Sequence, residues 1–576
     1  MKEVNEFVES DVLVIGGGLA GSLAGIAAKE ALGDGGKVVV VDKGKLGRSG
    51  QSPFAAGIYT AFEPAEDDLD EWMQEIVEWG EYLNDQEWCK LMFEKMLPVA
   101  QRIDNWGQQY GLKVFERDET GKFLRRRSRG HLKSKHNVVN SLPMMDTLRR
   151  KLKQGGVTIL DRVMVTDLIT SDGRVVGAVG LNPQTNTTTL LTFKTLVLAA
   201  SGCTFKSVFI GHKELTGDLQ VAAFEAGIAM RSFEQYASNT GSRDYDIHGL
   251  NLYVGVGGKF LNALGEEFMW KYHPVLGNRA RLQDLVLAFC REVQEGRGPV
   301  NLDMSAASPE DRQLCRKILP ESFMTWDRAG IDPFRQPVQW IPAFLGTIIS
   351  GGGIHINTRC ETNLPHVFAA GDITPIPPHG TYSFGGINLG FCGVSGWEAG
   401  LNAGEDARSA TKPPLGKKEL ALVTEVLKER LAPLMRAKGM LPEEAYPDIQ
   451  KALIPSGVGY LKSRSALEES LETLQQAQED ILPQLYAPDA HELAKAIEVR
   501  NMMKVGQLMV LSALSREESR GFHFREDFPM TDNENWLKWV MVKKEGEEIK
   551  LWPQEYPLPY VRPKEKLETP PGVRRV

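Results

Sequence analysis

The chain has 576 residues, with 67 Lys and Arg against 75 Asp and Glu, so its formal net charge is −8. This balance argues against a general nucleic-acid-binding protein, which is usually basic. The hydrophobic content of 42% and the charged content of 25% are typical of a globular protein with several domains. The 57 glycines are about a tenth of the 576 residues, above the usual share of ~7%. They follow no collagen-like period, so the excess indicates turns and close contacts between backbone and ligand.

The cysteines are too widely spaced to form a C-x-x-C pair. We therefore expect free thiols in a reducing cytoplasm, and neither a metal site nor an internal iron–sulfur cluster. The apolar run 12–28 follows an acidic start and contains five glycines, unlike a signal peptide or a membrane helix. We predict a cytoplasmic protein without direct membrane insertion, although partner subunits could associate it with a membrane.

The first 42 residues carry a dinucleotide-binding pattern. Residues 11–15 predict a buried strand, and residues 16–21 (GGGLAG) match G-x-G-x-x-G before a helix over 22–32 and a strand over 37–41. Gly16 permits the tight turn, Gly18 lets a pyrophosphate approach the backbone, and Gly21 allows close packing of helix and strand. Asp42 ends the second strand near the expected spacing of ~20 residues and can accept hydrogen bonds from ribose.

Later segments resemble those of flavoproteins with two dinucleotide folds. Residues 367–372 resemble L-x-A-x-G-[DE], whose acid (here Asp372) contacts the flavin, and this distant half favours FAD over NAD. The other matching segments are the loop 47–58 beside the isoalloxazine, the hairpin 163–177 with an adenine contact, the TGD turn 216–218, residues 351–354, residues 379–389 and the C-terminal signature 516–536.

These motifs extend from about Asp11 to Trp536, and the chain is identified by them as a member of the fumarate reductase/succinate dehydrogenase flavoprotein family. L-aspartate oxidase and the adenylylsulfate reductase α subunit belong to the same family. The resemblance implies an FAD-dependent oxidoreductase. Its FAD-binding residues would be Gly16, Gly18, Gly21, Asp42, Lys43, Ser49, Gly57, Val165, Asp218, Asp372, Asn388 and Leu389.

The resemblance also implies the architecture, which is of the α/β class. A Rossmann-like FAD-binding domain (1–235 and 350–405) would contain an inserted α+β capping domain (236–349). A helical domain (406–510) and a C-terminal segment (511–576) would follow. Helical spacing occurs over 417–438, 447–453 and 465–482, with a kink expected at Pro433. The tail from about 538 predicts a hairpin and then an extended, Pro-rich end.

The chain departs from the family pattern at two places. One is the position of the residue that links the flavin covalently, and the other is the set of residues that bind dicarboxylates. Gly50 replaces the histidine that holds the flavin, so we predict non-covalent FAD. The histidines and arginines that clamp fumarate align with uncharged residues: Ala237 or Ser238, 254–258, Gln283, 342–347 and Ser383. Each buried carboxylate of a C4 dicarboxylate needs paired donors, so we predict a different substrate.

Three residues are candidates for chemistry. His379 follows the Asp372 strand, and a histidine of adenylylsulfate reductase lies in a similar stretch, although His379 could merely pack or cap a helix. Arg281 could replace the missing arginine, or be a solvated surface residue. Tyr382 could donate a proton, or pack.

A basic cluster over 125–136 could steer a small anionic substrate or an acidic redox partner, or could be a solvated loop.

We predict that the chain exchanges electrons with a separate iron–sulfur or ferredoxin-like subunit. The alternatives are a true fumarate reductase or succinate dehydrogenase flavoprotein, an adenylylsulfate-reductase-like enzyme, and a subunit that relays electrons without its own substrate.

Overall fold

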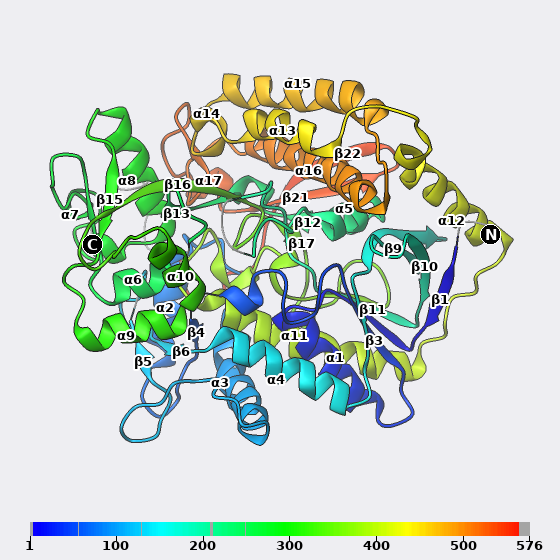
Figure 1. Cartoon of the computed structure of the whole chain (residues 1–576), viewed down its shortest axis with the longest axis horizontal. Helices are drawn as coiled ribbons and strands as arrows, with labels where there is room; N and C mark the ends of the chain where they lie inside the picture. The colour runs from blue at the N-terminus through cyan, green and yellow to red at the C-terminus, as the bar shows by residue number, and fades with distance from the viewer. Residues whose placement is uncertain (1–3, 56, 128, 208–210, 248, 564–576) are drawn as a thin grey trace.

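The computed structural model describes residues 4–55, 57–127, 129–207, 211–247 and 249–563 (Figure 1). Its centre is a five-stranded parallel sheet in the order β18 (Val367–Ala369), β11 (Thr195–Leu198), β2 (Val12–Ile15), β3 (Val38–Asp42) and β7 (Thr158–Asp161). The valines and leucines of β2, β3 and β11 are buried, as expected of a parallel sheet covered on both faces. The two N-terminal strands predicted from the sequence are therefore confirmed.

Two long helices pack together beside this sheet, α1 (Leu19–Leu32) and α11 (Ile387–Ser409) (Figure 1). Helix α1 begins three residues before the predicted start at residue 22, because the end of the glycine motif is already helical. The backbones approach closely, since a Cβ atom at Gly400 would lie 2.2 Å from the Ala24 carbonyl oxygen. This contact brings residues that are far apart in the sequence into one layer.

The predicted hairpin at 163–177 is confirmed by β8 (Met164–Ser171) and β9 (Arg174–Asn182), which pair antiparallel. They continue into a four-stranded sheet with β10 (Thr187–Thr192) and β1 (Glu6–Glu9).

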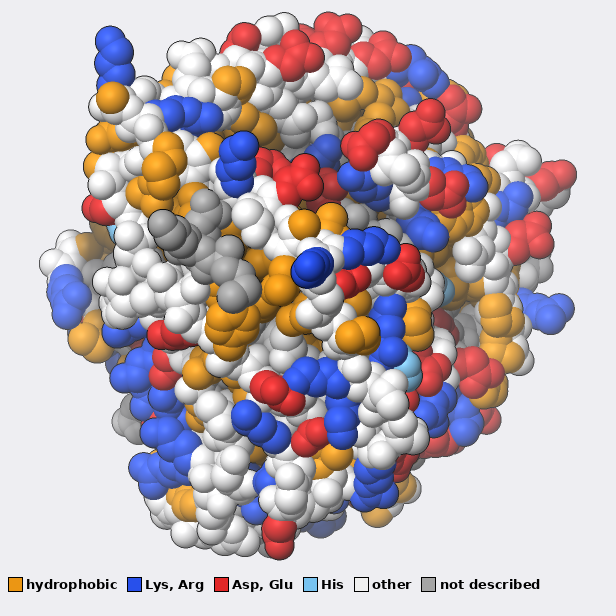
Figure 2. All heavy atoms as spheres, turned by 90° about the vertical axis from the view of Figure 1, so that its right-hand side faces the viewer, with side chains coloured by type: hydrophobic (Ala, Val, Ile, Leu, Met, Phe, Trp, Pro, Cys, Tyr) orange, Lys and Arg blue, Asp and Glu red, His pale blue; other side chains and the backbone are white. Residues whose placement is uncertain are grey.

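On the face in Figure 2, acidic and basic side chains are interspersed over most of the surface. That face therefore lacks the broad basic field typical of nucleic-acid binding.

A second hydrophobic core contains residues of the segment 237–348, with a few from outside it. Its antiparallel sheet has the order β13 (Ala237–Ser242), β16 (Val338–Gly346), β15 (Val300–Asp303) and β14 (Lys259–Leu261). Helix α8 (Leu282–Gln294) packs on β13 and contributes to the same core. The mixture of helices and strands agrees with an α+β cap, while the domain boundaries remain a prediction.

Helices of the segment 417–515 form the upper layer of Figure 1: α12 (Lys417–Arg430), α13 (Tyr446–Leu453), α15 (Arg464–Ile481) and α16 (Ala490–Ser515). The predicted kink at Pro433 is wrong. Helix α12 ends at Arg430, and Pro433 lies in a separate 3₁₀ turn (Ala432–Met435). A proline in the helix interior would remove a backbone donor, so a new turn forms instead.

The predicted C-terminal hairpin is confirmed by β21 (Trp539–Glu545) and β22 (Glu548–Gln554). Strand β21 pairs with β12 (Met230–Arg231), which pairs with β17 (Gly353–Ile354). Beyond the hairpin, the Gln86 amide oxygen accepts hydrogen bonds from the backbone of Tyr560 (2.9 Å) and Val561 (2.9 Å). The prediction of an extended end falls partly on residues 564–576, outside the described residues.

The C-terminal signature that begins at Arg516 forms a buried ionic network. Arg516 pairs with Glu234 (3.1 Å) and Glu518 (2.6 Å), and Arg520 pairs with Glu518 (2.8 Å), with all four side chains fully buried. Removing one member would leave an uncompensated buried charge. The C-terminal signature that the chain shares with the family therefore supplies buried ion pairs that stabilise the fold.

The remaining helices include α3 (Gln86–Gln109), which packs on α11 within the main core. The other helices are α2 (Leu69–Trp79), α4 (Ser141–Gln154), α5 (Asp218–Glu225), α6 (Leu250–Gly255), α7 (Met269–Tyr272), α9 (Pro309–Ile318), α10 (Pro320–Arg328), α14 (Ser456–Gly459) and α17 (Asn533–Trp536). The remaining strands are β4 (Ile58–Thr60), β5 (Arg125–Arg126), β6 (His136–Val138), β19 (Leu461–Lys462) and β20 (Phe524–Arg525). Within the described ranges, every helix is too short or too polar to cross a lipid bilayer.

Candidate active site

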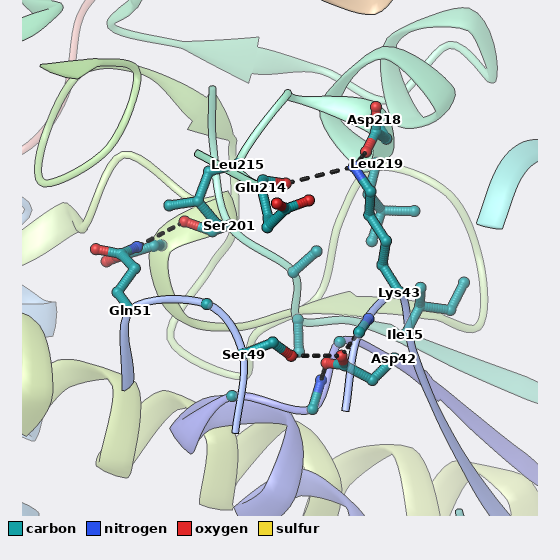
Figure 3. A pocket seen from close by; sticks show the side chains of 18 of the residues that line it. Ile15, Asp42, Lys43, Ser49, Gln51, Ser201, Glu214, Leu215, Asp218 and Leu219 are labelled. Carbon is teal, nitrogen blue, oxygen red and sulfur yellow. Dashed lines mark hydrogen bonds and ion pairs between the residues drawn. The ribbon is translucent and has the colours of Figure 1, made fainter. Parts of the chain in front are cut away.

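A cavity lies at the carboxyl ends of β2 and β3, beside the amino end of α1, and Figure 3 shows side chains that line it. We call it the dinucleotide cavity. Its walls include residues 16–18, 42–44, 49–52, 163–165, 199–202, 214–219, Asp372 and Cys392. The location at the strand ends of an open parallel sheet is the usual place for a nucleotide.

Glycine backbone shapes the phosphate end of this cavity. Gly16 has φ +113°, and a Cβ atom there would lie 2.3 Å from the Ala199 carbonyl oxygen. A Cβ atom on Gly21 would lie 1.8 Å from the Gly16 carbonyl oxygen, so Gly21 permits helix–strand packing and does not line the cavity. The first turn of α1 has no acidic residue, which leaves its amino end suited to a diphosphate.

The Asp42 carboxylate supports the backbone around the glycine loop. One oxygen accepts a hydrogen bond from the Gly17 N–H (2.7 Å), and the other accepts one from the Gly44 N–H (2.8 Å). Burial raises the pKa of Asp42. Asp42 also lines the cavity, so its remaining lone pairs are available to ribose hydroxyls.

Lys43 and Asp218 line the cavity as an ion pair. The Lys43 ammonium lies 2.8 Å from Asp218 and 2.5 Å from Glu498 of α16. Burial opposes the charge of Lys43, but the two carboxylates raise its pKa above the ordinary value. Ser49 and Val165 also line the dinucleotide cavity, whereas Gly57 does not. At Gly57 the φ is +75° and a Cβ atom would lie 2.2 Å from an Ile318 methyl group, so this glycine serves packing.

A smaller cavity adjoins the first and shares Gln51, Ser52, Asp372 and Cys392 with it. We call it the adjoining cavity. It lies between the FAD-binding segments and the second core. Its other lining residues are Ala55, Ile58, Arg129, His212, Asn239, Asn251, Leu345, Ile348, Ile349, Tyr382, Gly386, Asn388 and Leu389.

A polar bridge marks the boundary between the two cavities. The Gln51 amide nitrogen donates to the Ser201 hydroxyl (2.7 Å; Figure 3) and to the Asp372 carboxylate (2.6 Å). Burial raises the pKa of Asp372, and the hydrogen bond from Gln51 opposes that shift. Asn388 and Leu389 lie on the side of the adjoining cavity only.

His379 lies behind the adjoining cavity and is fully buried. The Ser383 N–H donates to its Nδ1 (3.1 Å), which places the proton on Nε2, 2.9 Å from the Asn388 amide oxygen. Burial lowers the pKa of His379 to about 3, so the ring is neutral at pH 7. Both nitrogens are engaged within the protein, and the ring stacks on Tyr382 with 4.4 Å between centroids. These contacts are those of a side chain that positions Asn388 and Tyr382, and the catalytic role of His379 stays a prediction.

Arg281 lies away from both cavities. It is 2% exposed and lines neither of them. Its guanidinium donates to both oxygens of Asp284 (2.8 and 2.9 Å) and to Glu81 (3.1 Å). Two carboxylates neutralise this arginine, an environment that favours a structural role, and its catalytic role stays a prediction.

Arg129 is the side chain that sequence reasoning did not single out. It is 2% exposed, donates through Nε to the Asn251 amide oxygen (2.8 Å) and through Nη2 to the Tyr382 hydroxyl (2.8 Å). Its Nη1 has no hydrogen-bond partner among the described residues. The only sequence signal was the basic cluster around it, which could not show which member faces inward.

Two other members of that cluster pair with carboxylates. Arg125 contacts the buried side chain of Asp67, and Arg126 lies 2.7 Å from the half-buried Asp311. The cluster is therefore not one solvated loop, because His131 and His136 are also buried while Arg127 and Lys133 are exposed.

Tyr382 lines the adjoining cavity, and its role as a site residue stays a prediction.

The parallel sheet, the glycine loop and the second cavity beside Asp372 define a flavoprotein with a dinucleotide-binding fold. A family model described as an FAD binding domain matches residues 11–389, and one described as the fumarate reductase flavoprotein C-terminus matches residues 450–574. The chain belongs to the fumarate reductase/succinate dehydrogenase flavoprotein family and is an FAD-dependent oxidoreductase. The predicted family, fold class and cofactor are thus confirmed.

Known proteins resemble the chain over nearly its whole length. One subunit of the fumarate reductase (CoM/CoB) of Methanothermobacter marburgensis is 28% identical, over 94% of this chain and 98% of its own. The solved quinol fumarate reductase of Escherichia coli has a TM-score of 0.87 at 22% identity, covering 99% of this chain and 100% of its own. Adenylylsulfate reductase of Archaeoglobus fulgidus has a TM-score of 0.81 at 20% identity, covering 98% of each chain.

Proposed function

We propose that the chain oxidises or reduces an organic anion other than a C4 dicarboxylate in the adjoining cavity. The carrying observation is the charge of the cavity wall. Among its described residues, Arg129 is the only lysine or arginine, and Asp372 is the only carboxylate. Two buried carboxylates of a substrate would each need paired donors, and a single guanidinium cannot clamp both ends.

FAD supplies the transfer of a hydride or an electron pair when it is bound. The chain would hold its diphosphate at residues 16–18 and the start of α1, and its ribityl region near Asp372. Tyr382 has a hydroxyl at the cavity wall, which suits it to hold or transfer a proton. His379 keeps Tyr382 and Asn388 in place.

We further propose that the electrons pass to or from a separate iron–sulfur or ferredoxin-like subunit. Within the described ranges, no group of His, Cys, Asp and Glu could hold a metal, and the free cysteines are dispersed. The chain also resembles a protein that is itself named as one subunit of a larger enzyme. A separate partner would then supply the second electron carrier.

A reoxidation experiment tests the substrate assignment. The FAD-loaded protein is reduced without oxygen and mixed with fumarate, while the flavin absorbance is followed. We expect no rapid reoxidation by fumarate, but full reoxidation by ferricyanide as a control of flavin competence. Rapid reoxidation by fumarate would favour the alternative of a fumarate reductase, which the names of several relatives support.

A second experiment tests the linkage of the cofactor. Gly50 has no side chain that could bond to the flavin, and a Cβ there would meet open space. We therefore expect acid precipitation to release yellow FAD into the supernatant. Flavin that stays with the washed pellet would contradict non-covalent binding.

A further inference from the structure

We propose that Arg129, Asn251 and Tyr382 form a recognition site for one oxyanion, so that the substrate carries a single carboxylate-like group on an otherwise neutral body. This inference rests on the proposed function, because it names the chemical class that the adjoining cavity takes. It goes further by assigning the charge recognition to a residue of the loop 129–134.

The guanidinium of Arg129 is buried without a protein counter-charge. No carboxylate of the described residues lies in an ion pair with it. Asp372 lines the same cavity, but its hydrogen bonds come from Gln51 and Asn388. A buried charge without a partner is strongly unfavourable, whereas an anionic ligand would supply the missing charge.

The directions of the hydrogen bonds leave one donor group for a ligand. Nε is engaged by Asn251 and Nη2 by Tyr382, which leaves the Nη1 amino group. Because Nη2 donates to the Tyr382 oxygen, the phenol proton of Tyr382 is free to point elsewhere. A ligand oxyanion at Nη1 and the Tyr382 O–H would satisfy both groups.

Internal contacts hold the loop that carries Arg129 in this position. The Gly385 N–H donates to the Arg129 carbonyl (3.0 Å), and the Gly130 N–H donates to the Arg279 carbonyl (2.7 Å). The buried Glu75 carboxylate accepts hydrogen bonds from the backbone of Leu132 (2.8 Å) and Ser134 (2.8 Å). The guanidinium is therefore pre-organised, and little ordering is needed when a ligand binds.

The rest of the wall accommodates a neutral body. Amides come from Gln51, Asn239 and Asn388, while Leu345 and Ile348 provide apolar surface. A second anionic end would meet amides, hydrocarbon and the imidazole of His212, without a further lysine or arginine of the described residues. The class of ligand is therefore an organic monoanion.

The test compares three four-carbon probes with the FAD-loaded protein. Crotonate has one carboxylate, fumarate has two, and crotonamide has none. Each is titrated into the oxidised holoprotein while the visible flavin spectrum is recorded. We expect a saturable difference spectrum with crotonate, and at least about tenfold weaker responses with fumarate and crotonamide.

Variants then locate the anion. Arg129→Gln should weaken crotonate binding by about ten- to hundredfold, because a charge-assisted hydrogen bond is lost, and leave the crotonamide response unchanged. Tyr382→Phe should weaken crotonate by about tenfold or less. The exposed Arg127 is the matched control, and Arg127→Gln should bind crotonate as the parent does. Arg129→Lys serves as a second variant should Arg129→Gln lose its flavin.

The outcomes separate this inference from the proposed function. If crotonate binds but no Arg129 variant weakens it, the inference is overturned while the proposed function stands. If fumarate binds as tightly as crotonate through Arg129, the single-anion class is overturned, and reoxidation by fumarate then decides the proposed function. If crotonate and a larger monoanion such as benzoate both give no saturable response, the recognition site is overturned.

Discussion

The two cavities of this flavoprotein are built in different ways although they share a wall. The dinucleotide cavity is shaped mainly by backbone of short contiguous segments, such as the glycine loop after β2. The adjoining cavity is formed by side chains from distant segments, including Arg129, Asn251 and Tyr382. Each wall segment of the dinucleotide cavity is a short run with a recognisable sequence pattern, whereas the adjoining cavity is lined mainly by single side chains from separate parts of the chain.

The largest effect is expected from a substitution in the glycine loop. Gly21→Ala should abolish retention of FAD, because its Cβ would lie 1.8 Å from the Gly16 carbonyl oxygen and force the helix away from the strand. Flavin content after purification measures the effect. Gly35→Ala is the control, since Gly35 is exposed, lies outside the cavity wall and its Cβ would meet no atom within 4 Å, so this variant should keep its flavin. Equal retention by both variants would show that backbone packing does not shape this cavity.

Glu75 should affect the adjoining cavity selectively. Glu75→Ala leaves the backbone donors of Leu132, Lys133 and Ser134 without their carboxylate, and should lower the free energy of unfolding by about 2–4 kcal/mol. Binding of crotonate should be lost while FAD remains. Denaturant unfolding and the flavin titration measure these two effects. The control is Glu71→Ala on the same helix, which removes only an exposed contact with Lys133. If Glu75→Ala lost both FAD and the ability to bind crotonate, the two cavities would not be separable.

Buried histidines predict how stability depends on pH. Burial lowers the pKa of His379 to about 3 and that of His131 to about 4, below the ordinary ~6.5. At a pH between the lowered pKa of each histidine and ~6.5, that histidine is protonated in the unfolded chain but neutral in the folded chain. The free energy of unfolding should therefore be greatest above pH ~6.5 and decrease as the pH falls, by up to about 1.4 kcal/mol per pH unit for each histidine.

Denaturant unfolding of the FAD-loaded protein at several pH values measures this slope. His379→Gln should reduce the slope by about one proton, and the exposed His491 provides the control variant His491→Gln, which should leave it unchanged. An unaltered slope in His379→Gln would mean that His379 is not held neutral behind the adjoining cavity.

The smallest effect is expected at Asp42. Asp42→Asn keeps the size of the side chain but turns an amide N–H₂ toward the Gly17 or Gly44 N–H, so FAD should bind about tenfold more weakly. Equilibrium titration of the apoprotein with FAD measures the change, and the exposed Asp34→Asn is the control. Unchanged affinity would indicate that Asp42 contributes only to the cavity wall.

Most of the strands and turns around the dinucleotide cavity could be predicted, because each of them has a pattern within a short stretch of sequence. The strands at β2 and β3, the hairpin of β8 and β9 and the C-terminal hairpin follow from short periodic runs with clear turns. The kink at Pro433 was wrong because periodicity over 417–438 cannot distinguish one bent helix from a helix and a separate turn. The domain boundaries remain a prediction.

The adjoining cavity was predicted less well. His379 and Arg281 were plausible from their neighbours in sequence, yet one is enclosed by Ser383 and Asn388 and the other by two carboxylates. Arg129 belongs to a basic run in which Arg125 and Arg126 pair with Asp67 and Asp311. Nothing in the order of residues shows which guanidinium is buried, because that depends on contacts with Asn251 and Tyr382 far along the chain.

The order of amino acids was enough to establish the family, the dinucleotide-binding pattern and FAD as the cofactor. Each of the motifs behind these conclusions is a short run of glycines and strand residues whose physical requirements are met locally, although the motifs themselves are spread from Asp11 to Trp536. The folded arrangement alone decided which charged side chains face the adjoining cavity and which are neutralised elsewhere. The reason is that the cost of burying a charge is set by partners from other segments, and those partners meet only when the chain is folded.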